Sequence, residues 1–156
     1  MSTGTPPRGR YGGDGGRHGT RVPPVIRPGC GAAFPGADRG DADADASHRG
    51  GNPGFVQVLS PTRLRRPDYL GNSMFPTLDN LELNPAAGLF PPGWETGSTL
   101  HLSGSARTVW AEEEIARVPG AQRLVEFEVT DVVEIQGAVG LRWSDPDCSR
   151  FNPPTG

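Results

Sequence analysis

The chain has 156 residues, a formal net charge of -3 and a pI near 5.6. This length suits one modest domain, and the acidic balance gives no overall attraction to nucleic acid or to an anionic membrane surface. No apolar run approaches the roughly 20 residues of a membrane-spanning helix, so we expect no association with a membrane.

Residues 1–40 are predicted to form a disordered tail. The first 36 residues contain ten glycines and six prolines, and such a composition buries too little apolar surface to offset the entropy lost on folding. Within the tail, residues 8–17 combine arginine and tyrosine with glycine, as flexible RNA-binding segments do. Because all fifteen basic residues of the chain are arginine, we favour a solvated tail of biased composition over a nucleic-acid partner.

A folded domain is expected over residues 41–156, where the composition changes. The alternation in 41–45 is compatible with a strand that opens the domain, although aspartate has a low strand propensity. Residues 55–59 predict a strand, and 62–66 predict its hairpin partner. Residues 67–72, Pro-Asp-Tyr-Leu-Gly-Asn, are typical of a turn.

The second half of the predicted domain mixes a short helix with further strands. Ser73 can cap a helix that runs to about residue 83, where Asn84 and Pro85 stop it. Leu78 and Leu81 mark the apolar side of this helix. The remaining elements are strands at 87–90, at 99–110 with a bulge or bend at Gly104 and at 123–135, and a short exposed helix at 111–117. This pattern predicts a mainly β (α+β) domain, such as a small barrel.

Familiar enzyme and metal motifs are missing from the sequence. His18, His48 and His101 share no ligand spacing with one another or with the cysteines, so we expect no metal site. There is no nucleophile elbow, Walker loop or dinucleotide fingerprint, and the glutamates at 112–114 predict a solvated helix face. The two cysteines lie far apart and outside any CxxC pattern, which predicts reduced thiols in a cytoplasmic protein. We therefore assign no catalytic residue.

Residues 47–58 place anion-binding side chains directly before a strand. Ser47 can donate a hydrogen bond to a phosphate oxygen, Arg49 can pair with two oxygens, and Gly50 lets the backbone approach closely. The predicted helix then begins with free N–H groups and a dipole that favour an anion. The candidate cofactor-binding residues are Ser47, Arg49, Gly50, Asn72, Ser73 and Asn80. A polar turn followed by an ordinary helix cap is the alternative interpretation.

Several motifs occur in the order found in a known family. The first reads Ser-His-Arg-Gly-Gly-Asn-Pro-Gly-Phe-Val, and the matching segments are 47–56, 71–81, 84–90, 95–106, 118–123 and 141–143. Together they resemble pyridoxamine 5'-phosphate oxidase-like proteins, in the branch of flavin-nucleotide-binding members. The resemblance implies the FMN-binding split-barrel fold, a six-stranded antiparallel barrel that is usually a homodimer with FMN between its subunits. It further implies a flavin-dependent oxidoreductase that acts on a small molecule or with a flavin-reductase redox partner.

Three departures from the family pattern leave alternatives open. Residues 31–38 stand where the family has an apolar first strand, but they are short and broken by proline and glycine, so that strand is expected to be weak or missing. Position 73 is serine where many relatives carry arginine, and Pro91 and Pro92 interrupt a strand. The alternatives are a cofactor-free split-barrel interaction module and RNA binding through the arginine- and glycine-rich tail.

Overall fold

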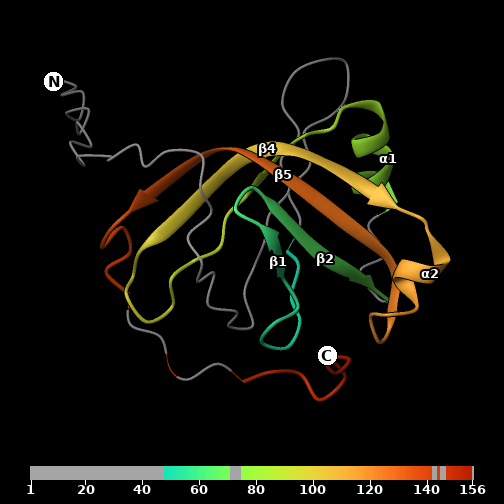
Figure 1. The fold of residues 1–156 in the computed structure, drawn as a ribbon. Coiled ribbons are helices and arrows are strands. Elements are labelled where there is room, and N and C mark those ends of the chain that lie inside the picture. The colour runs from blue at the N-terminus through green and yellow to red at the C-terminus, as the bar shows by residue number, and fades with distance from the viewer. Residues whose placement is uncertain (1–47, 71–74, 142–143, 145–146, 156) are drawn as a thin grey trace, which may run out of the picture.

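The computed structural model describes residues 48–70, 75–141, 144 and 147–155. These residues form one antiparallel sheet of five strands in the spatial order β1-β2-β5-β4-β3 (Figure 1). The strands are β1 (Gln57–Ser60), β2 (Arg63–Tyr69), β3 (Ala86–Leu89), β4 (Thr99–Val109) and β5 (Ala121–Ile135), and the helices are α1 (Phe75–Leu83) and α2 (Glu112–Ile115). Over the described residues the sheet is open, because β1 and β3 form its two edges. The prediction of a mainly β protein is therefore confirmed.

Most of the predicted elements appear with small shifts at their ends, but the turn predicted at 67–72 is wrong in its first half. Strand β2 continues through Tyr69, and Pro67 pairs with Leu124 of β5. Strand β1 pairs with β2 only as far as Arg65, so Pro67 has one neighbouring strand among the described residues. A residue without an N–H is tolerated at such an edge position, and the proline therefore does not end the strand.

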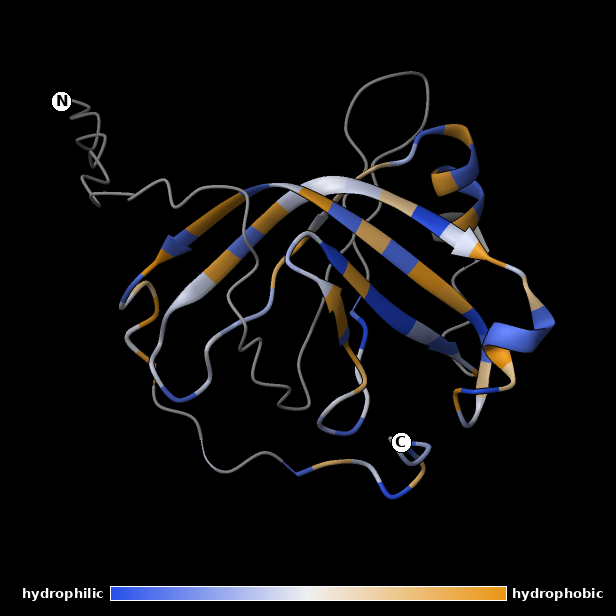
Figure 2. Ribbon diagram, in the orientation of Figure 1, coloured by the Kyte–Doolittle hydropathy of each residue, from blue (hydrophilic) through white to orange (hydrophobic). Residues whose placement is uncertain are grey.

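The core lies on the sheet face that α1 covers. Apolar and polar residues alternate along β4 and β5, which places the apolar side chains on one face (Figure 2). Helix α1 packs against β4 and contributes the two leucines that the sequence predicted for its apolar side. The buried cluster contains Leu64, Leu78, Leu81, Ala87, Leu102, Ala106, Val125, Phe127, Val129 and Val132.

The bulge expected at Gly104 is present, and it keeps the core continuous along β5. The register pairs Ser103 with Asp131 and Gly104 with Val129, so Thr130 is an extra residue on β5. This residue reverses the alternation, and Val129 and Val132 consequently both face the core. The two strands approach so closely here that a Cβ on Gly104 would lie 2.0 Å from the carbonyl oxygen of Glu128.

The segment 147–155 holds the loop that precedes β1, an arrangement the sequence did not predict. Asn52 donates a side-chain hydrogen bond of 3.0 Å to the carbonyl of Pro153, and the Thr155 hydroxyl donates one of 2.8 Å to the carbonyl of Pro53. Gly54 follows with a φ of +94°, which a glycine adopts without strain. The C-terminal segment therefore fixes the backbone a few residues after Arg49.

Several predictions concern residues outside the described ranges. These are the disordered tail over 1–40, the RNA-binding block at 8–17, the opening strand at 41–45 and the apolar first strand sought at 31–38. The described part of the proposed domain, 41–156, contains the sheet and both helices.

Candidate anion-binding site

The six candidate cofactor-binding residues divide into three groups in the structure. Arg49 and Gly50 are described together in the segment that leads into β1. Asn80 lies half-buried on α1, where its backbone carbonyl accepts a hydrogen bond of 2.8 Å from the N–H of Asn84. The other three candidates, Ser47, Asn72 and Ser73, lie outside the described residues.

Arg49 is buried, with only 2% of its surface exposed. An arginine on an ordinary polar turn extends its guanidinium into water. The burial of Arg49 therefore argues against the alternative interpretation of this segment as a polar turn. Among the described residues its Nε and Nη2 atoms have no hydrogen-bond partner, although the side chain does take part in other interactions. The structure thus places a cation inside the protein at the position where the sequence motif predicts a phosphate ligand.

Arg66 is a second buried arginine, and sequence reasoning missed it. It lies on β2 opposite Val125 of β5 and is 5% exposed. Within the described residues its one hydrogen bond runs from Nη1 to the neighbouring carbonyl of Pro67 at 3.4 Å, a marginal distance. Burial, together with the charge of Arg49, lowers the pKa of Arg66 to about 10, and the opposite charge of Asp68 offsets this in part.

Asp68 is the carboxylate nearest in sequence to Arg66, and a third arginine binds one of its two oxygens. Arg123 on β5 binds Oδ2 of Asp68 through Nη2 at 2.9 Å and through Nε at 3.1 Å. The other oxygen, Oδ1, is buried and has no hydrogen-bond partner in the described part of the chain. Arg123 also stacks over Trp110, with 5.6 Å from its Cζ to the ring centroid. We call Arg49, Arg66, Asp68 and Arg123 the arginine site; Arg49 and Arg123 also take part in further interactions.

A small cavity adjoins the arginine site. Its volume is about 20 Å³, and it is lined by Arg65 and Arg66 of β2, by Val56 before β1, by Leu81 of α1 and by further apolar residues. A water molecule fits such a space.

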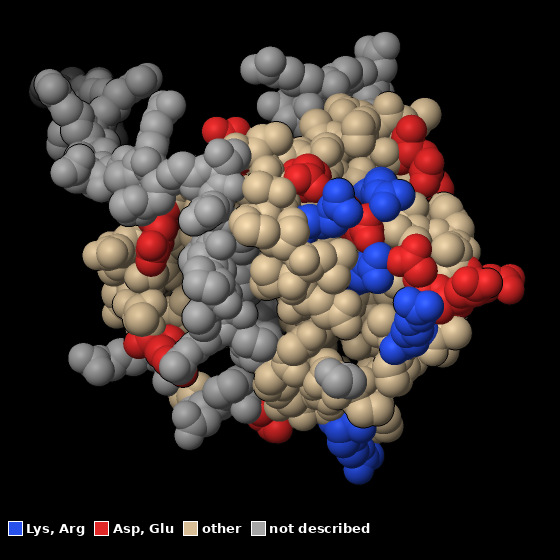
Figure 3. Space-filling model, viewed as in Figure 1, with Lys and Arg blue, Asp and Glu red and all other residues tan. Residues whose placement is uncertain are grey.

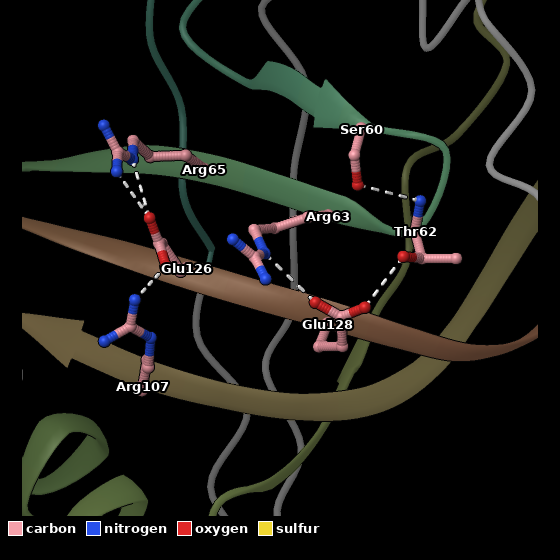
Figure 4. A network of polar contacts seen from close by, with 7 residues as sticks. All are labelled: Ser60, Thr62, Arg63, Arg65, Arg107, Glu126 and Glu128. Carbon is pink, nitrogen blue, oxygen red and sulfur yellow. Dashed lines mark hydrogen bonds and ion pairs between the residues drawn. The ribbon is translucent and has the colours of Figure 1, made fainter.

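The opposite face of the sheet carries a ladder of ion pairs (Figure 4). We call it the charged ladder, and Figure 3 shows its basic and acidic side chains side by side over β2 and β5. Glu126 lies between Arg65 and Arg107, and Arg65 also binds Glu114 of α2. Glu128 accepts hydrogen bonds from the Thr62 hydroxyl at 2.7 Å and from Nε of Arg63 at 3.1 Å; the members are Arg63, Arg65, Arg107, Glu114, Glu126 and Glu128.

Two carboxylates of the charged ladder, those of Glu126 and Glu128, have lowered pKa values and are held in the ionised state. Burial raises the pKa of Glu126, but hydrogen bonds from Arg65 and Arg107 outweigh it and leave the pKa below its usual value. The Thr62 hydroxyl, with Arg63, lowers the pKa of Glu128. These groups are poor general acids at neutral pH because they keep their charge. The ladder therefore stabilises the sheet and is not a candidate catalytic centre.

The histidines and cysteines provide no other site in the described part of the chain. His48 is exposed, and Nε2 of His101 is 3.2 Å from the hydroxyl of Thr99. No group of three metal-binding side chains occurs among the described residues. Cys148 is disulfide-bonded, so the expectation of reduced thiols is wrong for this residue. The described helices include none long and apolar enough to cross a membrane.

Comparison with known proteins leaves the arginine site as the main guide to function. No model of a known protein family matches the chain, and no curated protein matches it. The described residues show an open five-stranded sheet with one buried arginine on β2 and another in the segment that leads into β1.

Proposed function

We propose that the protein binds FMN and belongs to the pyridoxamine 5'-phosphate oxidase-like family. The burial of Arg49 carries this proposal, because Arg49 is the arginine of the motif that resembles the family's strand-opening segment. The five antiparallel strands would belong to a split barrel of the FMN-binding type. We propose a cytoplasmic homodimer with the flavin ring between the subunits.

The residues of this chain would bind and orient the cofactor. Arg49 would pair with phosphate oxygens through two parallel hydrogen bonds, and Gly50 would bring the backbone close to them. The remaining candidates would contribute hydroxyl, amide and helix N-terminal donors; they are Ser47, Asn72, Ser73 and Asn80. When bound, FMN supplies the electron or hydride transfer to a small molecule or to a flavin-reductase partner. No side chain is assigned as an acid or base.

The absorption spectrum of the purified full-length chain tests the proposal. We expect flavin bands in the protein as isolated or after incubation with FMN, and denaturation should release FMN that chromatography identifies. Arg49→Met should weaken FMN binding at least about tenfold, because a charge-assisted contact to phosphate is lost. Arg63→Met is the matched control, since Arg63 is an exposed member of the charged ladder on the other face. A protein that stays colourless after incubation with FMN would refute the proposal.

A cofactor-free interaction module is the second candidate function. The observations that favour it are Ser73, which stands where many relatives carry arginine, and Pro91 and Pro92, which interrupt a strand. This candidate predicts that the protein forms no flavin complex at any oligomeric state. Sedimentation of the chain with and without FMN separates the two candidates, because only a flavoprotein would carry flavin absorbance in its boundary.

A further inference from the structure

Cys148 lies in the C-terminal segment, 147–155, and carries a covalent bond to another part of the chain. It is disulfide-bonded, and the only other cysteine in the sequence is Cys30. Cys30 precedes the described residues, whereas Cys148 is partly exposed and lies between exposed neighbours in a segment without helix or strand. Exposed disulfides are the ones that reducing agents reach and that serve as reversible switches. The contacts around Cys148 therefore decide what its bond controls.

Side-chain hydrogen bonds hold the C-terminal segment against the loop that precedes β1. The side-chain amide of Asn152 donates a hydrogen bond of 3.3 Å to Oδ1 of Asn52, whose own amide donates one to the carbonyl of Pro153. The hydroxyl of Thr155 donates a third hydrogen bond to the carbonyl of Pro53. Among the described residues, no backbone hydrogen bond joins this segment to the sheet. A segment that is held by a few side-chain contacts opens more easily than a strand does.

Pro153 also contacts the turn that precedes β5. Gly120 in this turn has a φ of +73°, and a Cβ added to it would lie 2.5 Å from Cγ of Pro153. The same Cβ would lie 3.9 Å from Cδ1 of Tyr69, the buried last residue of β2. The proline ring therefore lies directly on the backbone where β2 ends and β5 begins. The C-terminal segment thus bridges the loop before β1 and the turn before β5.

We propose that Cys30 and Cys148 form a redox-sensitive clasp. When oxidised, their disulfide keeps the C-terminal segment on the loop and on Gly120; when reduced, the segment is released from both. In the reduction, one thiolate of a dithiol attacks a sulfur of the bond, and the second thiolate of the dithiol then displaces the remaining protein sulfur from the mixed disulfide. The dithiol becomes a disulfide, and the two electrons and two protons that it loses produce the two protein thiols. The clasp is independent of the proposed function, because its evidence includes neither FMN nor Arg49.

A permanent structural cross-link is the competing explanation, and the composition of the core distinguishes the two. The buried cluster consists of residues from α1 and from strands β2 to β5, and it includes none of the described residues 147–155. Loss of the bond should therefore release the C-terminal segment and leave the sheet folded. The segment would then keep one tether, the chain that follows Ile135. Contacts of a singly tethered segment open more often, because the released segment samples more positions.

Peptide mapping and amide hydrogen exchange of the full-length chain test the clasp. The chain purified without reductant should yield a linked pair of peptides that contain Cys30 and Cys148, and dithiothreitol should separate them with a gain of two hydrogens. We expect reduction to speed amide exchange in 149–155 at least about fivefold, while peptides from β4 stay within about twofold of the oxidised protein. The β4 peptides report that the sheet remains folded.

Three variants complete the test. Cys30→Ser and Cys148→Ser should each exchange like the reduced wild type and should not respond to dithiothreitol, because neither can form the bond. Ser144→Ala is the matched control, since Ser144 is exposed and precedes the C-terminal segment. This control should keep the full response of the wild type to dithiothreitol.

The clasp would be refuted by several distinct results. Free thiols at both cysteines, or a disulfide between two copies of the chain, would contradict the pairing. Equal exchange of 149–155 in the oxidised and reduced protein would show that the bond does not hold the segment. Faster exchange in β4 as well, or reduction that succeeds only after unfolding in urea, would identify a permanent structural cross-link. None of these results bears on FMN binding, so failure of the clasp leaves the proposed function untouched.

Discussion

Replacement of Arg66 by methionine should stabilise the ligand-free protein. Burial and the charge of Arg49 lower the pKa of Arg66 to about 10, which corresponds to roughly 3 kcal/mol against the charged form in the folded state. Below pH 10 the side chain is charged in both states, so this cost is fully present at pH 7 and is relieved only as the pH rises from about 10 towards the ordinary pKa of arginine. Methionine has a similar length without the charge and buries well among the core residues.

The expected gain is about 1–3 kcal/mol in the free energy of unfolding, since the variant also loses the attraction of Asp68 and the contact to Pro67. Urea unfolding at pH 7 in a buffer without phosphate measures this difference, with Arg63→Met as a control that should stay within about 0.5 kcal/mol of the wild type. A loss of 1 kcal/mol or more in Arg66→Met without ligand would refute the reasoning, because Arg66 would then be a stabilising residue.

Three other predictions concern the sheet, the charged ladder and the C-terminal segment. Gly104→Ala should cost about 1–3 kcal/mol in thermal or urea unfolding, because the new Cβ would lie 2.0 Å from the carbonyl oxygen of Glu128; an unchanged midpoint would contradict this. The pKa of Glu126 is lower in the folded protein than its ordinary value of 4.5. Its carboxylate should therefore stabilise the protein above pH 4.5, and this contribution should be lost as the pH falls through the lower folded pKa. Glu126→Gln should consequently flatten the acid side of the curve of stability against pH. Asn52→Ala should speed amide exchange in 149–155 by removing the hydrogen bond to Pro153, and unchanged exchange would show that the contact is not stabilising.

Local patterns in the sequence predicted most of the sheet. The alternation over 123–135 is that of a strand with one buried face, and the structure has β5 there. The bulge at Gly104 could be predicted because only glycine permits so close an approach of two strands. The sequence predicted a turn at Pro67 because a proline usually interrupts a strand. Proline is tolerated in β2 because the pairing of β1 with β2 ends at Arg65, so no β1 residue pairs with Pro67. The point at which this pairing ends depends on the packing of the whole sheet, and no local sequence pattern predicts it.

Only part of the candidate site could be predicted, again because local patterns identify some residues and not others. Arg49 follows from a motif of adjacent residues, whereas Arg66 stands in a run of arginines within a chain that has no lysine. Its alternation with Leu64 does place it on the core side of β2, and this was the signal that could have identified it. The contact of the C-terminal segment with the loop at Asn52 joins residues 101 positions apart and could not be read from either segment alone.

The ³¹P resonance of FMN bound to the wild-type protein tests the central claim most directly. Free phosphate monoesters change from two charges to one with a pKa of about 6, and the chemical shift follows this change. In the proposed site the buried guanidinium of Arg49 pairs with the phosphate. We predict that the bound phosphate keeps both charges as the pH is lowered from 8 to 5. A bound phosphate that titrates near pH 6, as the free nucleotide does, would contradict the claim that the buried Arg49 holds it.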